Sequence, residues 1–259
     1  MPEPAGTVKP RDSKRRGREG MAAGQRTARR GLFARLIRWI GRLVLGLLIV
    51  LALGLLLYRF IPAPSTLMIA RWLSLQPVER QWVPLDQISS ALIRSVIAAE
   101  DQRFCAHSGV DWIELNTVLD DEDGPSRGAS TLTMQTAKNL FLWHGRSYIR
   151  KALEIPLALA IDLAWPKQRI IEVYLNIAEW GDGLFGAEAA AQRYFKKSAA
   201  GLTGPEASRL AAALPNPSAR DPGRPSRSLQ AGAVRVQRRL GQLGALGNCA
   251  VPEGEEDMD

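Results

Sequence analysis

The chain has 259 residues, 46% of them hydrophobic, which suits one globular domain with additional short segments. Its formal net charge is +8, but residues 1–42 carry 12 Lys and Arg against three acids, and residues 43–259 have a net charge of −1. The basic excess therefore belongs to the N-terminal segment. This distribution argues against a nucleic-acid-binding face on the folded domain, and we expect no nucleic-acid partner.

Residues 1–38 form the basic segment, which is rich in Arg, Gly, Pro and Ala and is predicted to be a disordered tail. Residues 39–61 are predicted to form a transmembrane helix. Leu43–Tyr58 has no charged residue in 16 positions, and a spanning helix needs roughly 20 mainly apolar residues. Trp39 and Tyr58 suit the two membrane interfaces.

Two other interpretations of this apolar run are a cleaved signal peptide and a buried core helix. The run is long for a signal peptide, and no clear small-x-small cleavage site follows it. A core helix should not follow so basic a tail. Six Arg residues between positions 26 and 42 precede the run, whereas Arg59 and Arg71 are the sparse basic residues after it. The positive-inside rule then predicts a cytoplasmic N-terminus and an external domain.

The rest of the chain is predicted to be mainly α. Residues 62–84 hold four prolines and are expected to be an extended stalk. Residues 85–220 are expected to form the domain, with a first helix capped by Asp86 and reaching Glu100. Residues 221–259 are expected to be a C-terminal helix and a frayed tail. Further helices are predicted over 131–142 (capped by Ser130), 147–163, from Pro166 onward, 187–200, 205–214 and 228–242.

The chain has two cysteines, Cys105 and Cys249. A disulfide is possible for a domain outside the cytosol. One pair of cysteines in a domain of this size is not the pattern of a disulfide-stabilised fold, however, and we expect two free thiols. The chain also has two histidines, His107 and His144, so no Cys and His cluster has the spacing of a zinc site.

Glu100 is the first candidate for chemistry. Ile93, Val96, Ile97 and Glu100 follow one another at steps of three and four, so the carboxylate shares a helix face with an apolar stripe. Desolvation would raise its pKa and suit it to act as a general base near neutral pH. The competing interpretation is that Glu100 ends its helix and turns to solvent.

The run Arg127–Asn139 is the second candidate. Thr131, Gln135 and Lys138 fall on one helix face, and Arg127 precedes the helix where free backbone N–H groups favour an anion. This pattern would suit a phosphate or a pyrophosphate. A solvated polar helix face explains it equally simply.

Arg146, Arg150 and Glu154, spaced by four, are the third candidate, with Lys151 beside them. They could take up charge on a leaving group, or they could be surface ion pairs of little energetic weight. The apolar run Leu140–Gly145 precedes them. It could be core, or a lip that dips into a bilayer.

Taken together, these segments resemble the peptidoglycan glycosyltransferase family, the module found in class A penicillin-binding proteins and alone in monofunctional biosynthetic transglycosylases. The resemblance covers about residues 65–220 and is closest to the monofunctional branch. Six runs in the family's order carry it: Ala99–Phe104 with His107, Gly109 and Asp111; Arg127–Asn139; Arg146–Glu154; Lys167–Asn176; Ala178–Phe195; and Glu206–Pro217.

The resemblance implies a lysozyme-like, mostly helical domain with a small membrane-contacting jaw near Leu140–Gly145. It implies that Glu100 is the base on the 4-hydroxyl of an acceptor sugar, which attacks C1 of a donor linked to undecaprenyl pyrophosphate, with inversion. Glu154 matches the family's second catalytic glutamate, which orients or supports the leaving pyrophosphate. The expected substrate-binding residues are Lys138 and Arg146 at the pyrophosphate, and Arg150, Gln135, Ser130, Thr131, Arg127 and Asp101.

The resemblance also implies partners and a location. The substrates would be lipid II and a growing lipid-linked strand, at the bacterial inner membrane with a periplasmic catalytic domain. Division or elongation proteins are candidate partners. A divalent ion, Mg or Mn, could assist the pyrophosphate, although no dedicated metal site is visible. No Ser-x-x-Lys is followed by Lys-Thr-Gly, so we expect no transpeptidase module.

Several positions depart from the family pattern. Met134 stands where a glutamine is usual, and we expect it to alter donor contacts. Thr117 replaces a basic residue of several relatives, and Asp120–Asp123 makes that side acidic. Two rival functions remain, a glycan-cleaving enzyme of lysozyme type, which would also use a catalytic glutamate, and a non-catalytic scaffold that binds lipid II.

Overall fold

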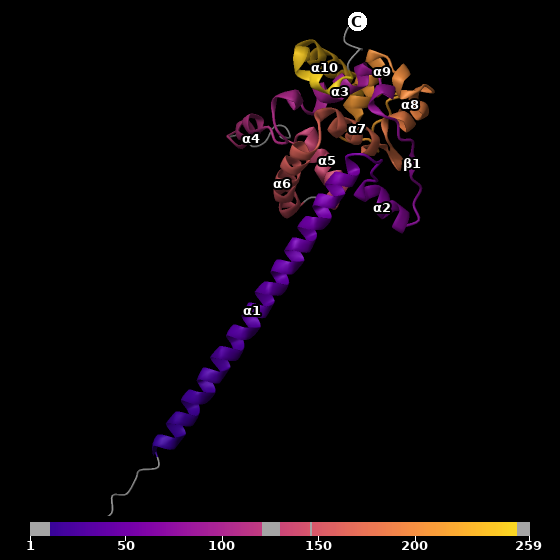
Figure 1. The fold of residues 1–259 in the computed structure, drawn as a ribbon. Helices are drawn as coiled ribbons and strands as arrows, with labels where there is room; N and C mark the ends of the chain where they lie inside the picture. The colour runs from indigo at the N-terminus through magenta and orange to yellow at the C-terminus, as the bar shows by residue number, and fades with distance from the viewer. Residues whose placement is uncertain (1–10, 121–129, 146, 253–259) are drawn as a thin grey trace, which may run out of the picture. The chain divides into compact units, whose positions relative to one another are not determined.

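The structure, a computed structural model, describes residues 11–120, 130–145 and 147–252. The chain divides into two units, residues 1–54 and residues 55–259. Helix α1 (Arg11–Tyr58) supplies the described part of the first unit (Figure 1). Its segment Arg35–Tyr58 is 24 residues long and contains an 18-residue window with a mean hydropathy of 2.6, so it is long and apolar enough to cross a membrane.

Residues 11–38 are helical in the structure, which differs from the predicted disordered tail. The sequence between Arg11 and Tyr58 holds no proline and is rich in Arg, Ala and Leu, which are strong helix formers. The helix ends at Tyr58 and a turn follows, so residues 59–61 of the expected membrane helix lie outside it.

The second unit is mainly α, as predicted (Figure 1). Its sheet has the strand order β1-β3-β2, with β1 parallel and β2 antiparallel to β3. The elements are α2 (Thr66–Leu73), β1 (Glu79–Arg80), α3 (Ser90–Glu100), α4 (Trp112–Leu119), α5 (Leu132–Phe141), α6 (Tyr148–Ala164), α7 (Lys167–Ile177), β2 (Glu179–Gly181), β3 (Leu184–Phe185), α8 (Ala187–Phe195), α9 (Gly204–Ala213), α10 (Arg227–Leu243), and short 3₁₀ turns at Leu85–Gln87, Phe104–Ala106, Ala199–Gly201 and Gly244–Ala250.

Helix α3 is the central element for the site. Its cap is Ser89, whose hydroxyl accepts from the Leu92 N–H, rather than the predicted Asp86, which lies in the preceding 3₁₀ turn. The prediction was wrong because Ser89, four residues before the stripe begins at Ile93, is an equally good cap by residue type. The stripe itself is confirmed, since Ile93, Val96 and Ile97 are fully buried.

Helix α5 also begins later than predicted. Thr131, not Ser130, is its cap, and the Thr131 hydroxyl accepts from the Met134 N–H. Either hydroxyl could serve by residue type, and tertiary contacts decide between them. Pro166 is the cap of α7, which agrees with a proline at the start of that helix.

Residues 62–84 are not a plain extended stalk. Ser65 caps helix α2, in which Met68 is fully buried. The Thr66 hydroxyl donates to the carbonyls of Asn139 (3.2 Å) and Leu142 (2.7 Å) at the end of α5. The prolines of this stretch lie before and after helix α2 and not inside it, so they are compatible with a structured part of the domain.

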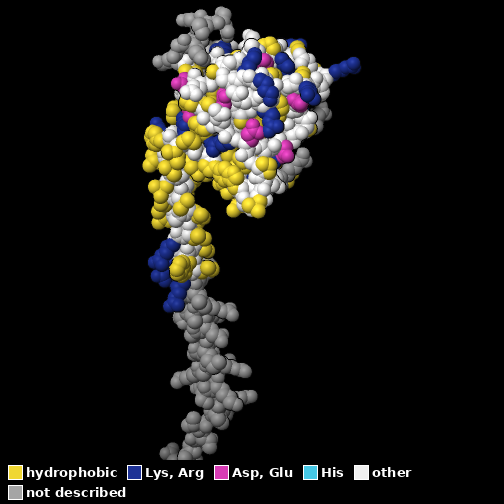
Figure 2. Space-filling view, turned by 90° about the vertical axis from the view of Figure 1, so that its right-hand side faces the viewer, with side chains coloured by type: hydrophobic (Ala, Val, Ile, Leu, Met, Phe, Trp, Pro, Cys, Tyr) yellow, Lys and Arg dark blue, Asp and Glu magenta, His cyan; other side chains and the backbone are white. Residues whose placement is uncertain are grey.

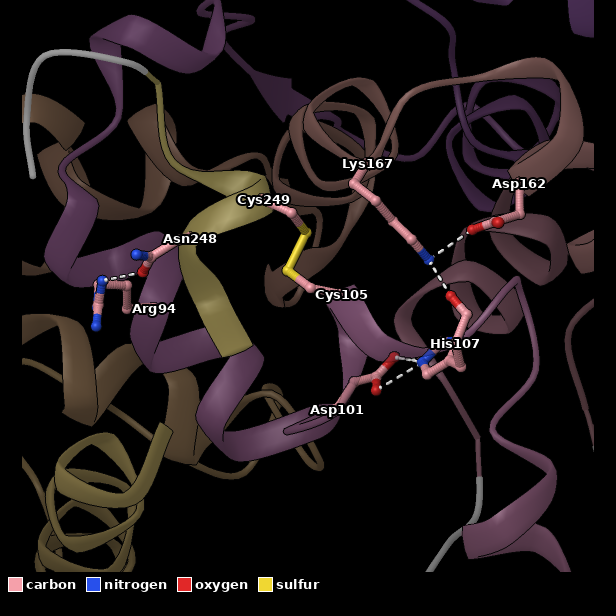
Figure 3. Close-up of a disulfide and its surroundings, with 8 residues drawn as sticks. All are labelled: Arg94, Asp101, Cys105, His107, Asp162, Lys167, Asn248 and Cys249. Atoms are coloured by element: carbon pink, nitrogen blue, oxygen red, sulfur yellow. Dashed lines mark hydrogen bonds and ion pairs between the residues drawn. A yellow bond between two sulfur atoms is a disulfide. The ribbon is translucent and has the colours of Figure 1, made fainter. Parts of the chain in front are cut away.

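The C-terminal segment is also part of the domain. Helix α10 packs against α9 and α3 (Figure 1). Cys105 and Cys249 form a disulfide, so the prediction of free thiols was wrong (Figure 3). Arg94 of α3 reinforces this junction by donating to Asn248 Oδ1 (3.1 Å) and to the Gly244 carbonyl (3.2 Å). A pairing across a sequence separation of 144 leaves no local pattern.

We predict that this disulfide stabilises the domain. Because it closes a loop of separation 144, replacing both cysteines by serine should lower the free energy of unfolding by about 2–4 kcal/mol. Urea unfolding of the full chain measures this. Dithiothreitol should destabilise the wild type by a similar amount and leave the double variant unchanged. An equal response of both proteins to the reductant would contradict the prediction.

Candidate active site

Glu100 ends helix α3, and its carboxylate is partly buried. Gln135, on α5, donates from Nε2 to Glu100 Oε2 at 2.9 Å. The predicted alignment of Glu100 with the apolar stripe therefore holds, and the carboxylate does not simply turn to solvent. This hydrogen bond comes from a residue that was predicted for the same site.

Tyr174, on α7, sets the direction of the Gln135 amide. Its hydroxyl donates to Gln135 Oε1 at 3.1 Å. Full burial, and then the charge of Glu100, raise the pKa of Tyr174 well above its ordinary value, so the hydroxyl keeps its proton. A donor at Oε1 leaves the amide N–H₂ to face Glu100. The sequence analysis missed Tyr174 because its position among buried apolar residues of α7 resembles a core tyrosine.

The pKa of Glu100 is raised, first by burial, which penalises the charged form. Asp101 raises it further. The hydrogen bond from Gln135 and the charges of Lys138 and Arg239 oppose the rise. The carboxylate is thus held as a stronger base than an exposed glutamate, which is the property that a general base needs.

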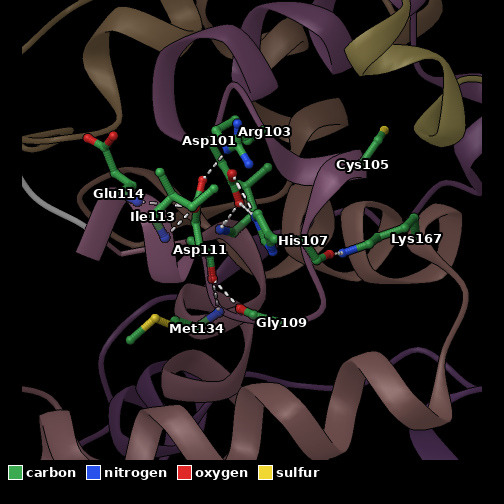
Figure 4. A network of polar contacts seen from close by, with 12 residues as sticks. Asp101, Arg103, Cys105, His107, Gly109, Asp111, Ile113, Glu114, Met134 and Lys167 are labelled. Carbon is green, nitrogen blue, oxygen red and sulfur yellow. Dashed lines mark hydrogen bonds and ion pairs between the residues drawn. The ribbon is translucent and has the colours of Figure 1, made fainter. Parts of the chain in front are cut away.

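Asp101 is buried and its carboxylate is used inside the fold (Figure 4). It accepts from the Leu132 N–H at 2.9 Å and lies 2.9 Å from His107 Nε2. Lys167 holds the same loop by donating to the His107 carbonyl at 2.7 Å. These contacts brace the end of α3 against the start of α5. Asp101 also lines the cavity beside Glu100, and its predicted binding of substrate stays a prediction.

Thr131 is likewise buried. Its hydroxyl donates to the Gly109 carbonyl at 2.6 Å. Gly109 has φ +76°, and a Cβ there would lie 2.7 Å from the Ala158 carbonyl oxygen, so the loop needs glycine at this position. Thr131 lines the cavity beside Glu100, but its hydroxyl is already committed to the loop.

A group of basic side chains surrounds the start of α6. Arg150 and Lys151 both pair with the buried carboxylate of Glu154, Lys151 at 2.9 Å. Lys151 also donates to the Ser130 hydroxyl. Two cations share one carboxylate here, so the group keeps a positive charge. The predicted residues Arg127 and Arg146 lie outside the described residues.

The pKa values of several basic groups at this site are lowered, because the groups are partly buried and close to one another. Burial, followed by the charge of Arg150, lowers the pKa of Lys138, and burial, Arg150 and Lys138 lower that of Lys151 to about 8. Burial and the same two neighbours, Lys138 and Arg150, lower the pKa of His144. Mutual repulsion among partly buried cations would be relieved by a bound anion, as at a phosphate site.

Two hollows have Gln135 in their linings. A cavity of about 320 Å³ is lined by Glu100, Gln135 and Ser130 among others. A second hollow contains Gln135, Lys138, His144 and Tyr174 in its lining. Gln135 thus lies beside both the base and Lys138, and a reaction between a hydroxyl and a pyrophosphate-linked sugar needs a base and a cation near one another. The first cavity also contains Arg239 of α10, which the sequence analysis missed because α10 lies outside the family motifs used for the resemblance.

The run Leu140–Gly145 combines both predicted interpretations. Leu140 and Leu142 are buried, whereas Trp143 is 48% exposed.

An exposed apolar edge lies on other elements, and Figure 2 shows hydrophobic side chains gathered there. The strongly exposed members on α2 and after it are Trp72, Leu73 and Leu75, and those on α6 are Tyr148, Ile149 and Leu163. Such a surface is typical of membrane or partner contact.

Two departures from the family pattern, Met134 and Thr117, are absent from the linings of the hollows beside Glu100. Met134 is buried and packs with Val110 and Ala158, so its side chain fills the core and does not face the cavity, contrary to the expected effect on donor contacts. Thr117 is on α4 and donates to the Ile113 carbonyl. Of the acidic stretch, Asp120 is described and residues 121–123 are not. The part of the chain that the structure describes contains no group of three or more His, Cys, Asp or Glu that could hold a metal ion.

Comparison with known proteins agrees with this geometry. A family model described as "Transglycosylase" matches residues 67–242. The chain is 51% identical over 221 residues to a biosynthetic peptidoglycan transglycosylase of Brucella suis biovar 1 (strain 1330), covering 82% of this chain and 99% of that protein. Proteins of the same name from Rhizobium meliloti (strain 1021) and Rhodopseudomonas palustris (strain TIE-1) are 47% and 55% identical, covering 88% and 79% of this chain and 99% and 89% of their own lengths.

The chain therefore belongs to the transglycosylase family, and the resemblance drawn from its motifs is confirmed. The match from residue 67 to residue 242 includes α2 from its second residue and most of α10. This agrees with the packing of both helices onto the domain.

We predict that Gln135 lowers the pKa of Glu100 through its hydrogen bond. In Gln135→Leu the carboxylate loses a donor that favours its charged form, so its pKa should rise further. A ¹³C titration of the Glu100 carboxyl, assigned through its loss in Glu100→Gln, measures this. Gln192→Leu is the matched control, since Gln192 donates to Glu188 on α8. A pKa unchanged in Gln135→Leu would disprove the coupling.

Proposed function

We propose that this chain is a peptidoglycan glycosyltransferase that polymerises lipid II into glycan strands during cell wall synthesis. The observation that carries the proposal is a partly buried glutamate held by the Gln135 amide, with Gln135 also lining the hollow that contains Lys138 of the cation group. The name shared by the relatives supports the same activity.

In the proposed reaction Glu100 accepts the proton of the acceptor's 4-hydroxyl. The hydroxyl oxygen forms a bond to C1 of the donor sugar from the face opposite the leaving group, so the configuration inverts. The bond from C1 to the pyrophosphate oxygen breaks and its electron pair leaves with the lipid pyrophosphate. Gln135 and Tyr174 hold the carboxylate in line for this step.

The pyrophosphate gains negative charge as it leaves, and nearby cations would stabilise it. Lys138 and Arg150 are proposed for this role, together with Arg146 and Arg127 by family resemblance. Glu154 is proposed to orient Arg150 and Lys151, since it pairs with both. Ser130, Thr131 and Asp101 support the walls of the site. A divalent ion, Mg or Mn, could add charge stabilisation at the pyrophosphate, and no step here depends on it.

The proposed location is the bacterial inner membrane, crossed once by residues 35–58, with the N-terminus in the cytoplasm and the catalytic domain in the periplasm. The exposed apolar edge is proposed to contact lipid, which would bring the site to the lipid-linked substrates. Proteins of the division or elongation machinery are proposed partners.

We predict that Glu100→Gln lowers the polymerisation rate on lipid II by about 10²- to 10⁴-fold, because glutamine keeps the size of the side chain and removes the base. Gel analysis of glycan strands measures the rate. Glu79→Gln, at an exposed carboxylate paired with Arg193, should polymerise like the wild type. The pKa of Glu100 is raised, so this carboxylate takes up a proton at a higher pH than an ordinary glutamate does. When the pH is lowered, the wild-type rate should therefore begin to fall at a higher pH than it would with an ordinary glutamate as the base. A variant as fast as the wild type would remove Glu100 from its role.

We predict that the domain following the apolar helix is outside the cytoplasm. Protease added to intact spheroplasts should degrade the domain and leave a short fragment with an N-terminal tag, because the basic residues hold the N-terminus inside. A cytoplasmic protein serves as the control for intact membranes. Protection of the domain until the spheroplasts are lysed would reverse the orientation.

A further inference from the structure

A groove beside Glu100 is not used by the proposed chemistry. It has a volume of about 260 Å³ and lies where α10 packs on α9 and the end of α3. It shares Ala99, Glu100 and Arg239 with the cavity that contains Gln135, so it continues from the reaction centre. Lys138, His144 and Lys151 are not among its lining residues.

The rim of the groove is cationic. Arg220, Arg235 and Arg239 line it, and Glu100 is the one acidic side chain among the described residues of its lining. Arg220 donates to the Ala212 carbonyl at 2.7 Å and Arg239 to the Ala99 carbonyl at 3.1 Å. Each bond uses one N–H of a guanidinium that has five, so both side chains are held in place with donors to spare.

The floor of the groove consists of small residues. Ala211 and Ala212 come from α9 and Gly232 from α10. A Cβ on Gly232 would lie 3.4 Å from the Ala212 Cβ, so the two helices approach closely at this point. Buried Leu229 and Val236 fix α10 on the domain. The arginines therefore stand beside a shallow apolar floor.

The junction after α10 is braced. The disulfide joins Cys249 to Cys105, five residues after Glu100, and Arg94 bonds to Gly244 and Asn248 in the same turn (Figure 3). These links hold the end of α10 against the element that carries the base. A preorganised cationic groove binds an anion at a lower entropic cost than a mobile one.

We propose that this groove binds the carboxylates of the peptides carried by the glycan strand. The inference rests on the proposed function. A pyrophosphate has its own cations around Lys138, in a different hollow, whereas this groove adjoins Glu100, at which the acceptor sugar is proposed to react. Every peptide ends in a carboxylate, and the planar fork of arginine matches a carboxylate with two parallel hydrogen bonds.

The test compares Arg235→Gln with Arg238→Gln. Both positions are exposed on α10, but Arg238 does not line the groove. Polymerisation by the full chain is measured with lipid II and with lipid II whose peptide carboxylates are amidated. Arg235→Gln should raise KM for lipid II about three- to ten-fold and leave kcat within two-fold, since it removes a charged hydrogen bond from binding alone. Arg238→Gln should match the wild type.

With the amidated substrate, Arg235→Gln and the wild type should have equal KM values. A KM increase that persists on the amidated substrate, or equal behaviour of the two variants on lipid II, would overturn the proposal. A second measurement does not need turnover: calorimetric binding of the soluble disaccharide-peptide should weaken in Arg235→Gln and not in Arg238→Gln. If the wild type makes no polymer, the proposed function fails, and the binding result still decides on the groove.

Discussion

The site depends on one partly buried carboxylate, that of Glu100, whose charged form is disfavoured by burial and supported by its neighbours. Glu100 ends a helix whose other residues on that face are fully buried, and its charge is supported by a hydrogen bond from Gln135 and by more distant cations. The balance raises its pKa while the carboxylate remains accessible from a cavity. Helices α3, α5 and α7 must meet in one arrangement for this. Tyr174 of α7 orients the amide of Gln135 on α5, and this amide in turn orients the Glu100 carboxylate at the end of α3.

The same segment shows why the residues next to a base serve the fold. Asp101, Thr131 and His107 all have a place in the motifs, yet their side chains bond to the backbone and to one another. Leaving such buried groups unpaired would cost free energy, so they brace the loop between α3 and α5. Glu154 acts in a comparable way, since two cations hold its buried carboxylate.

Charge is divided between two sides of the reaction centre. Lys138, Arg150 and Lys151 gather near the start of α6, where burial, and then repulsion from neighbouring cations, lowers the pKa values of both lysines. Of the groove's arginines, Arg235 and Arg239 lie on α10 and Arg220 precedes it. The disulfide and Arg94 tie the turn that follows α10 to the domain. An elongated anionic substrate with charges at separated points would satisfy both groups.

The sequence by itself determined the apolar N-terminal helix, the mainly α domain, the stripe that carries Glu100 and the family, because periodicity and motif order are local properties of the chain. It assigned the wrong caps to α3 and α5, predicted an extended stalk where helix α2 lies, and predicted free thiols for two cysteines that form a disulfide. Only the tertiary structure brought Tyr174 to Gln135, buried Met134, and joined Cys249 to Cys105. These contacts link residues far apart in the chain, and packing selects them from alternatives that local pattern leaves equivalent.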